Sequence, residues 1–217
     1  MPRVALFGGS FNPIHYGHLL AADDVLEALR LDRVLFVPAK IPPHKPGADL
    51  APAPDRYEMV RLAVADHPGF AVSDLEIRRA GPSYTVDTLT ALGAGGDELY
   101  LLLGSETFLD LLAWREPRRI AALARLVIVP RAGSAFDPDG APAQKVLREV
   151  GIEGGFARAT GGDLSTRGAL IVHATSLPVS GSDLRRRLRE GRSVAYRMPP
   201  AAVAYVRARG LYGARRG

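Results

Sequence analysis

Short apolar runs alternate with amphipathic stretches along most of this chain. Uninterrupted apolar runs predict buried strands at 3–7, 33–38, 98–103, 126–130 and 169–173, and an alternating pattern predicts another at 70–77. Hydrophobic residues at helical spacing, with helix start and stop residues around them, predict helices over 19–30, 55–66, 108–112, 118–123, 145–150, 180–191 and 200–210, and a further helix that begins near 85.

The first two strands and the helix between them form a βαβ unit. Such units are right-handed and imply a parallel sheet, with ligands bound at the carboxyl ends of its strands. We therefore predict an α/β fold, namely a Rossmann-like doubly wound parallel sheet of five to six strands flanked by helices. A small C-terminal helical region at about 180–217 completes one domain over 1–217.

The turn after the first strand contains the most informative residues of the chain. Gly8 and Gly9 follow the apolar run, and His15 and His18 stand where the next helix begins. Helix N-termini present unpaired N–H groups and a partial positive charge, and glycines let a backbone approach a ligand closely. This arrangement predicts an anion site that offers imidazoles as side chains.

Other interpretations of the two histidines have to be weighed. The turn is neither the Gly-x-Gly-x-x-Gly dinucleotide motif nor a P-loop with Gly-Lys-Ser/Thr. Two histidines three residues apart provide half of a zinc site, but the chain has no cysteine to complete one. Two structural histidines at a helix start remain the other alternative.

A second helix start, at 180–191, repeats the pattern of an anion site. Ser180 and Ser182 precede a run of arginines, and Gly191 can end the helix. Arg185 lies three residues after Ser182 and can point back over the cap. The alternative for any one arginine here is a solvated basic face.

The loop at 40–54 is rich in proline, which excludes a helix or a central strand. Lys45, with His44 beside it, is placed to reach a phosphate if this loop acts as a lid. A rigid solvated loop is the alternative.

Two further segments offer groups that a planar ligand could use. Ser83, Tyr84 and Thr85 stand at the open end of the helix that begins near 85. Trp114, the one tryptophan in the sequence, precedes a polar turn and is either a stacking surface or a buried structural residue.

Composition limits the class of protein. The 217 residues carry a formal net charge of +5 and no cysteine, which excludes a disulfide framework and favours a soluble cytoplasmic protein. No apolar run approaches a membrane span, and no signal pattern is apparent. The basic charge suits a phosphate-rich ligand, and we do not infer nucleic-acid binding from charge alone.

Taken together, these segments resemble bacterial nicotinate-mononucleotide adenylyltransferases, members of the nucleotidyltransferase superfamily. The matching segments are 8–18 (Gly-Gly-Ser-Phe-Asn-Pro-x-His-x-Gly-His), 42–45, 81–89, Trp114, 129–131, 180–185 and the C-terminal Gly-Leu-Tyr at 210–212. The first and last phosphate motifs specify only the superfamily. The combination of Pro-Pro-His-Lys at 42–45, Ser-Tyr-Thr at 83–85 and Trp114 narrows the resemblance to nicotinate mononucleotide.

The resemblance implies a role for each matching residue. His15, His18 and Arg185 would be catalytic, with His18 on the oxygens of the reacting phosphorus. The residues implied in ATP binding are Gly8, Gly9, Ser10, Phe11, Lys45, Gly104, Glu106, Ser180 and Ser182. Those implied in binding nicotinate mononucleotide are Ser83, Tyr84, Thr85, Trp114 and Arg131.

Two positions depart from the family pattern. The usual Ser-Ser-Thr is Ser180-Gly181-Ser182 here, which keeps two hydroxyls of three. The usual aspartate after Gly104 and Ser105 is Glu106, whose carboxylate is one methylene further out.

The implied reaction transfers AMP from ATP to nicotinate mononucleotide, giving deamido-NAD and pyrophosphate in NAD biosynthesis. Mg²⁺ would be held mainly by the phosphates, without a dedicated protein site. The implied partners are the two substrates, with no nucleic acid and no membrane, in a monomer or homodimer. Alternatives are another adenylyl- or cytidylyltransferase, acting on phosphopantetheine or nicotinamide mononucleotide, or a nucleotide- or RNA-binding protein without turnover.

Overall fold

The computed structural model describes residues 1–43, 49–131, 133–158 and 168–214. Contacts divide the chain into two compact units, each assembled from three segments. Unit 1 consists of Met1–Phe7, Ala21–Leu35 and Tyr84–Ser176, and unit 2 of Gly8–Leu20, Phe36–Ser83 and Leu177–Gly217. The single domain expected over 1–217 stays a prediction.

Seven strands of the described chain form one sheet in the order β3–β2–β1–β4–β5–β7–β6. Their bounds are β1 Arg3–Gly9, β2 Arg33–Pro38, β3 Phe70–Val72, β4 Glu98–Gly104, β5 Arg125–Val129, β6 Phe156–Arg158 and β7 Ala169–Ile171. The pairs β1–β4, β4–β5, β5–β7 and β7–β6 are parallel. The order reverses at β1, which confirms the doubly wound α/β fold, and the Gly8–His18 turn follows this strand.

The predicted count of five to six strands was too low. β6 has three residues and no alternation of apolar and polar positions, so the sequence carries no signal for it. The strand predicted over 70–77 was too long. Its second half folds as α3 (Leu75–Arg78), because the Ser73 hydroxyl accepts a hydrogen bond from the Leu75 N–H (3.2 Å) and starts a helical turn.

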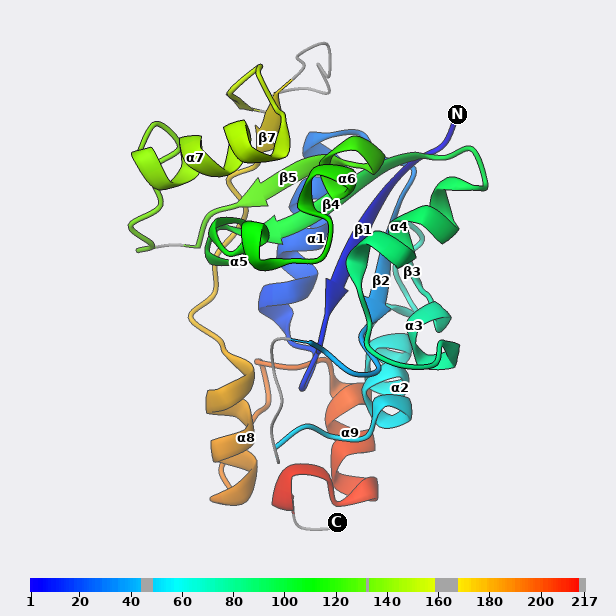
Figure 1. Cartoon of the computed structure of the whole chain (residues 1–217). Helices are drawn as coiled ribbons and strands as arrows, with labels where there is room; N and C mark the ends of the chain where they lie inside the picture. The colour runs from blue at the N-terminus through cyan, green and yellow to red at the C-terminus, as the bar shows by residue number, and fades with distance from the viewer. Residues whose placement is uncertain (44–48, 132, 159–167, 215–217) are drawn as a thin grey trace. The chain divides into compact units, whose positions relative to one another are not determined.

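Unit 1 contains the apolar strands β4, β5 and β7 with helices on both faces. Figure 1 shows α1 (Tyr16–Ala28) on one face and α4 (Thr85–Gly93), α5 (Ser105–Leu109) and α6 (Pro117–Leu123) on the other. The short helix η1 spans Leu111–Ala113, and α7 (Ala141–Val150) packs against α5 and α6. α7 begins four residues before the predicted start, because Pro142 is favourable in a first helical turn.

Unit 2 contains α2 (Ala53–Val64), α8 (Gly181–Arg189), α9 (Pro200–Arg209) and η2 (Leu211–Gly213), with α2 packed against α9. The predicted serine cap of α8 is confirmed, since the Ser180 hydroxyl accepts a hydrogen bond from the Asp183 N–H (3.2 Å). The helix predicted over 55–66 begins earlier than expected. α2 begins at Ala53, and the Asp55 carboxylate accepts hydrogen bonds from the Tyr205 hydroxyl (2.7 Å) and the Arg209 Nε–H (3.2 Å).

The described residues include no helix with the length and apolar character that a membrane crossing requires.

Arg56 on α2 is fully buried and joins the Gly8–His18 turn to two positions on the chain between β2 and α2. Its guanidinium donates to three backbone carbonyls, from Nε to Ala51 (2.9 Å), from Nη1 to Ser10 (2.7 Å) and from Nη2 to Lys40 (3.1 Å). Burial lowers the pKa of Arg56 from its ordinary value, but arginine keeps its charge in proteins. The three carbonyls surround this charge and fix the start of the Gly8–His18 turn.

Replacing Arg56 with methionine should lower the free energy of unfolding by about 3 kcal/mol or more, because three backbone carbonyls lose their donors. Urea unfolding measures this loss. Arg61 provides the matched control on the same helix, since its side chain is 50% exposed and pairs with Glu58. R61M should change the unfolding free energy by less than about 1 kcal/mol. Equal effects of the two substitutions would contradict a structural role for the buried charge.

Candidate functional site

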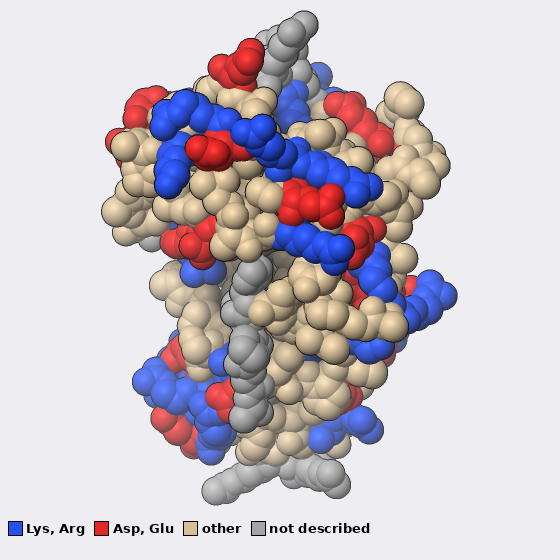
Figure 2. Space-filling model, viewed as in Figure 1, with Lys and Arg blue, Asp and Glu red and all other residues tan. Residues whose placement is uncertain are grey.

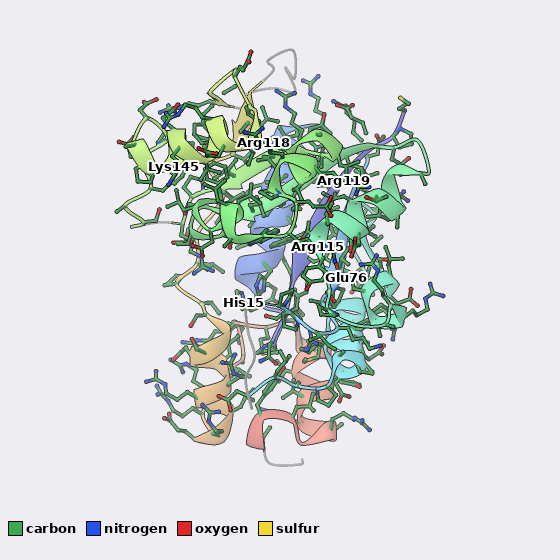
Figure 3. The ribbon with its side chains drawn as sticks, viewed as in Figure 1. His15, Glu76, Arg115, Arg118, Arg119 and Lys145 are labelled. Carbon is green, nitrogen blue, oxygen red and sulfur yellow. The ribbon has the colours of Figure 1, made fainter. Side chains whose placement is uncertain are left out.

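Two stacked imidazoles form the centre of the Gly8–His18 turn in unit 2. The ring centroids of His15 and His18 lie 3.7 Å apart with an interplanar angle of 24°. The His15 N–H donates to Nδ1 of His18 (3.3 Å), so Nε2 is the nitrogen that carries the proton in neutral His18. His15, marked in Figure 3, is buried at the start of α1, and its carbonyl accepts from the His18 N–H (2.9 Å).

Glycines in this turn make room for the aromatic rings. A Cβ on Gly17 would lie 3.1 Å from Nδ1 of His15, and a Cβ on Gly9 would lie 3.2 Å from the Phe11 ring. The buried Phe11 ring supports His18 edge-on, at 5.2 Å between centroids. A Cβ on Gly8 would meet no atom within 4 Å, so this part of the turn has space beside its backbone.

Arg185 on α8 reaches the same turn, as its position after the serines predicted. Its Nη1 donates to the backbone carbonyl of Asn12 (2.7 Å), and its buried Nε has no hydrogen-bond partner among the described residues. The Ser180 and Ser182 hydroxyls lie 3.1 Å apart at the start of α8. Unit 2 therefore brings together the two predicted anion-binding helix starts.

The neighbouring arginines of α8 have a different partner. Arg187 and Arg186 donate to the Asp183 carboxylate at 2.8 and 2.5 Å. These two bonds, the one from Arg187 first, lower the pKa of Asp183 from its ordinary value. The alternative of a solvated basic face thus describes Arg186, which is exposed, but not Arg185.

Close packing explains why Gly181 stands where the family pattern has a serine. A Cβ on Gly181 would lie 2.9 Å from the carbonyl oxygen of Asn12, closer than such atoms approach in proteins. A serine at this position would push the start of α8 away from the turn.

The residues predicted to bind the acceptor lie mainly in unit 1. Tyr84 precedes α4, with the Arg115 guanidinium 4.9 Å from the centre of its ring, and Thr85 is the first residue of the helix. Trp114 follows η1 and is half-buried. Its role, as a stacking surface or as a structural residue, stays a prediction. The contact between Arg115 and Tyr84 was not predicted, because an arginine in a polar turn is common and gives no sign of its partner.

Glu106 and Arg131 follow the neighbouring strands β4 and β5, whose last residues Gly104 and Val129 are in register. Their charged groups form an exposed pair, with Nε of Arg131 3.9 Å from Oε2 of Glu106. The longer carboxylate of Glu106 thus has a cationic neighbour within unit 1.

Ser83 belongs to unit 2 and supports the beginning of the predicted lid. Its buried hydroxyl accepts from the Lys40 N–H (3.0 Å), and its own N–H donates to the Ile41 carbonyl (3.0 Å). Lys45 and His44 lie outside the described residues.

The Gly8–His18 turn and the start of α8 offer hydrogen-bond donors, namely imidazole, hydroxyl, guanidinium and backbone N–H groups. Such donors suit phosphate oxygens more than a cation. Within the described part of the chain, no group of three or more His, Cys, Asp or Glu residues is arranged to hold a metal ion. The residues fit an ion that is carried by the phosphates of a nucleotide.

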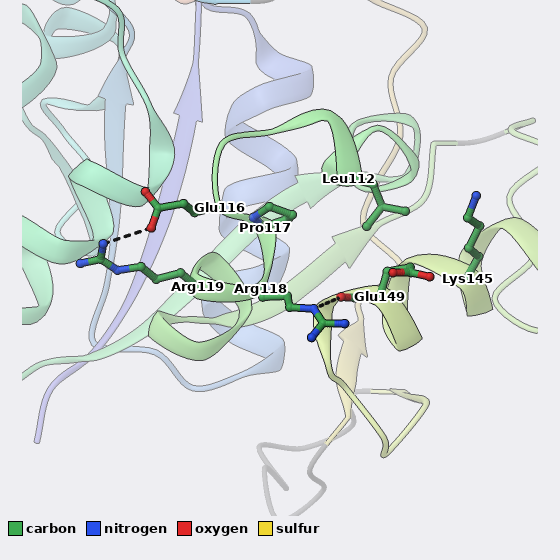
Figure 4. Close-up of a pocket in the computed structure, with 7 residues that line it drawn as sticks. All are labelled: Leu112, Glu116, Pro117, Arg118, Arg119, Lys145 and Glu149. Atoms are coloured by element: carbon green, nitrogen blue, oxygen red, sulfur yellow. Dashed lines mark hydrogen bonds and ion pairs between the residues drawn. The ribbon is translucent and has the colours of Figure 1, made fainter.

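A hollow of about 730 Å³ on unit 1 contains none of the predicted site residues (Figure 4). Its lining residues are Leu112, Glu116, Pro117, Arg118, Arg119, Lys145 and Glu149. Arg119 pairs with Glu116 (3.2 Å), and Arg118 donates to the Glu149 carbonyl (2.7 Å). Figure 2 shows acidic side chains interspersed among the basic ones on the viewed face.

Comparison with known proteins identifies relatives over almost the full length. The cytidylyltransferase-like family model matches residues 6–187. A protein of Roseiflexus sp. (strain RS-1), named "Probable nicotinate-nucleotide adenylyltransferase", is 44% identical over 211 residues, which cover 96% of this chain and 97% of the relative. A protein of the same name from Thermus thermophilus is 44% identical over 213 residues, 97% and 99% of the two chains.

Solved structures with low sequence identity share the fold. A Plasmodium falciparum nicotinic acid mononucleotide adenylyltransferase complexed with NaAD aligns with a TM-score of 0.75 at 17% identity, over 99% of both chains. The same enzyme complexed with APC gives a TM-score of 0.73.

Replacing Gly17 with alanine should displace the His15 ring by a few tenths of an ångström and lower the rate of nucleotidyl transfer about tenfold, because small misplacements reduce reactivity. Steady-state kinetics with ATP measure this loss. In G93A, the control, the new Cβ on α4 meets Leu99 at an ordinary 3.7 Å, and activity should stay at the wild-type level. Wild-type turnover in G17A would contradict a role for the stacked pair.

Proposed function

Because this chain belongs to the nicotinate-nucleotide adenylyltransferases of the cytidylyltransferase-like family, we propose that it transfers AMP from ATP to nicotinate mononucleotide, giving deamido-NAD and pyrophosphate. The observation that carries this proposal is the grouping in unit 2 of the stacked His15 and His18 with Arg185. Imidazoles and a guanidinium at two helix starts suit a triphosphate.

The reaction needs no nucleophilic side chain. An oxygen of the 5′-phosphate of nicotinate mononucleotide forms a bond to the α-phosphorus of ATP, and the bond from that phosphorus to the α–β bridging oxygen breaks. Pyrophosphate leaves with the electron pair of the broken bond. Since the attacking phosphate is already an anion, the protein contributes position and neutralises charge on the pentacoordinate phosphorus.

In this proposal the residues of unit 2 hold the triphosphate. His18 donates from Nε2 to an oxygen of the reacting phosphorus, and His15 supports its ring by stacking. The unpaired Nε–H of Arg185 donates to the β/γ phosphates, with the Ser180 and Ser182 hydroxyls beside it. The backbone of Gly8, Gly9, Ser10 and Phe11 lies along the nucleotide, and Lys45 approaches a phosphate from the lid.

The acceptor roles are proposals for residues of unit 1. Thr85 and the first N–H groups of α4 bind the nicotinate carboxylate, because a helix start favours an anion over a neutral amide. Trp114 stacks on the pyridine ring, and the half-exposed position of its indole supports this role. Tyr84 and Arg131 are also proposed to contact the acceptor, as is Ser83, the one of these residues that belongs to unit 2. Gly104 and Glu106 are proposed to contact the adenosine part of ATP.

Mg²⁺, the cellular location and the assembly belong to the same proposal. Mg²⁺ bound to the ATP phosphates would reduce their negative charge, while the side chains of unit 2 orient them. We place the enzyme in the cytoplasm, as the absence of cysteine favours, and as a monomer or a homodimer.

Pyrophosphate release with ATP and Mg²⁺ tests the function directly, with nicotinate mononucleotide, nicotinamide mononucleotide and phosphopantetheine compared as acceptors. We expect the highest kcat/KM with nicotinate mononucleotide. A preference for another acceptor would assign the chain to a different nucleotidyl transfer, and ATP binding without release from any acceptor would indicate a binding protein.

Replacing His18 with alanine should lower kcat by about 10²–10³, because it removes a donor to the transition state, while the KM for ATP changes much less. His67 gives a matched control in the same unit. Its ring also stacks on an aromatic neighbour, Phe70, at 3.8 Å, and its Nδ1 also accepts from a backbone N–H, that of Gly69. H67A should keep wild-type kcat, and a kcat of wild-type size in H18A would remove His18 from the mechanism.

A further inference from the structure

The C-terminal Gly-Leu-Tyr segment at 210–212 has no role in the reaction described above, yet it reaches the Gly8–His18 turn. The Tyr212 hydroxyl lies 2.6 Å from Oδ1 of Asn12. Tyr212 has a left-handed backbone, with φ +57°, which an L-residue adopts only when its surroundings hold it there. A half-buried tyrosine in this conformation, bonded through its hydroxyl to the turn, requires an explanation.

The other hydrogen bonds of Asn12 show that the Tyr212 hydroxyl is the donor in this contact. Oδ1 of Asn12 accepts from the Ala51 N–H (3.1 Å), and Nδ2 donates to the Asp49 carbonyl (2.8 Å). These two backbone groups fix the orientation of the amide, because an N–H can only donate and a carbonyl can only accept. The Tyr212 hydroxyl therefore donates its proton to Oδ1. Burial raises the pKa of Tyr212 well above its ordinary value, which keeps this donor protonated.

Asn12 also touches Arg185, through its backbone. Its carbonyl oxygen accepts from Nη1 of Arg185 at 2.7 Å. With Nη1 held in this way, the guanidinium is fixed in orientation, and its Nε–H is a buried donor with no hydrogen-bond partner among the described residues. An unpaired buried donor costs about 1–3 kcal/mol, so this edge of Arg185 is prepared for an acceptor such as a phosphate oxygen.

We propose that Tyr212 is a positioning residue for adenylyl transfer: it holds Asn12, and Asn12 in turn holds the guanidinium of Arg185 in the orientation that meets the triphosphate. This inference rests on the proposed function of Arg185. Tyr212, Asn12 and Arg185 all lie in unit 2 and form one continuous chain of contacts. Removing the hydroxyl loosens the end of this chain without removing any group that touches substrate.

The test compares Tyr212→Phe with Tyr196→Phe. Tyr196 is a matched control, since it also has a left-handed backbone (φ +60°) in unit 2 but is 94% exposed. Y212F should lower kcat about tenfold and leave the KM for nicotinate mononucleotide unchanged, because a misoriented donor acts on the transition state. Y196F should match the wild type.

A double-mutant cycle with Arg185→Ala separates positioning from a general structural effect. If Tyr212 acts through Arg185, Y212F has almost no further effect on kcat in the R185A background. An equal loss of kcat in both backgrounds would overturn the proposal, as would wild-type kcat in Y212F.

An activity-independent measurement is the ¹⁵N–¹H resonance of Arg185 Nε, assigned by its disappearance in R185A. Y212F should shift this resonance and speed its exchange with water, whereas Y196F should not. An unchanged resonance in Y212F would overturn the proposal even where R185A turnover is too slow to measure. If the wild type releases no pyrophosphate, the proposed function fails, and the resonance still decides whether Tyr212 orients Arg185.

Discussion

The buried charge of Arg56 is the interaction on which unit 2 depends. A guanidinium removed from water must satisfy its donors inside the protein, and Arg56 does so on the carbonyls of Ala51, Ser10 and Lys40. Each of these belongs to a segment without regular structure. Because these carbonyls cannot move away without leaving a buried charge unsatisfied, one side chain on α2 restrains two connections at once. These are the Gly8–His18 turn and the stretch between β2 and α2, which is held at Lys40 and at Ala51.

This constraint matters because the reaction of this family depends on where the protein places its hydrogen-bond donors. An enzyme that supplies no nucleophile depends on where its donors stand, and the donors here come from a turn and from two helix starts. Gly17 leaves room for the His15 ring, the Phe11 ring supports His18, and the carbonyl of Asn12 holds Arg185. The proposed site therefore depends on a few imidazole, hydroxyl and guanidinium groups whose positions are set largely by backbone contacts.

Much of this could be predicted from the sequence, for identifiable reasons. Continuous apolar runs located β1, β2, β4, β5 and β7, since strands buried on both faces leave a strong signal. Ser180 marked a helix start because its hydroxyl can accept a hydrogen bond from a backbone N–H, and Gly210 marked a helix end because its left-handed conformation suits few other residues. The strand β6 and the exact start of α2 were missed, because short or proline-led elements depend on tertiary contacts.

The supporting residues were harder to find than the ligand-facing ones. Arginine in a helix usually lies on a solvated face, so the burial of Arg56 was not predicted. A signal existed, since Arg56 precedes the buried Met59 and Val60 by three and four residues and so shares their face of α2. Asn12 is part of the motif at 8–18, but its partners are backbone groups and a tyrosine 200 positions away, which no local pattern encodes.

That separation along the chain has a consequence for how the protein is made. The Gly8–His18 turn is synthesised before its partners, since the bonds to Arg185 and Tyr212 join it to residues 173 and 200 positions further along the chain. Contacts of such high sequence separation form late, because a long stretch of chain must be ordered before they can close. During synthesis the turn therefore exists without these restraints, and the two histidines are present before the contacts that hold Asn12 beside them.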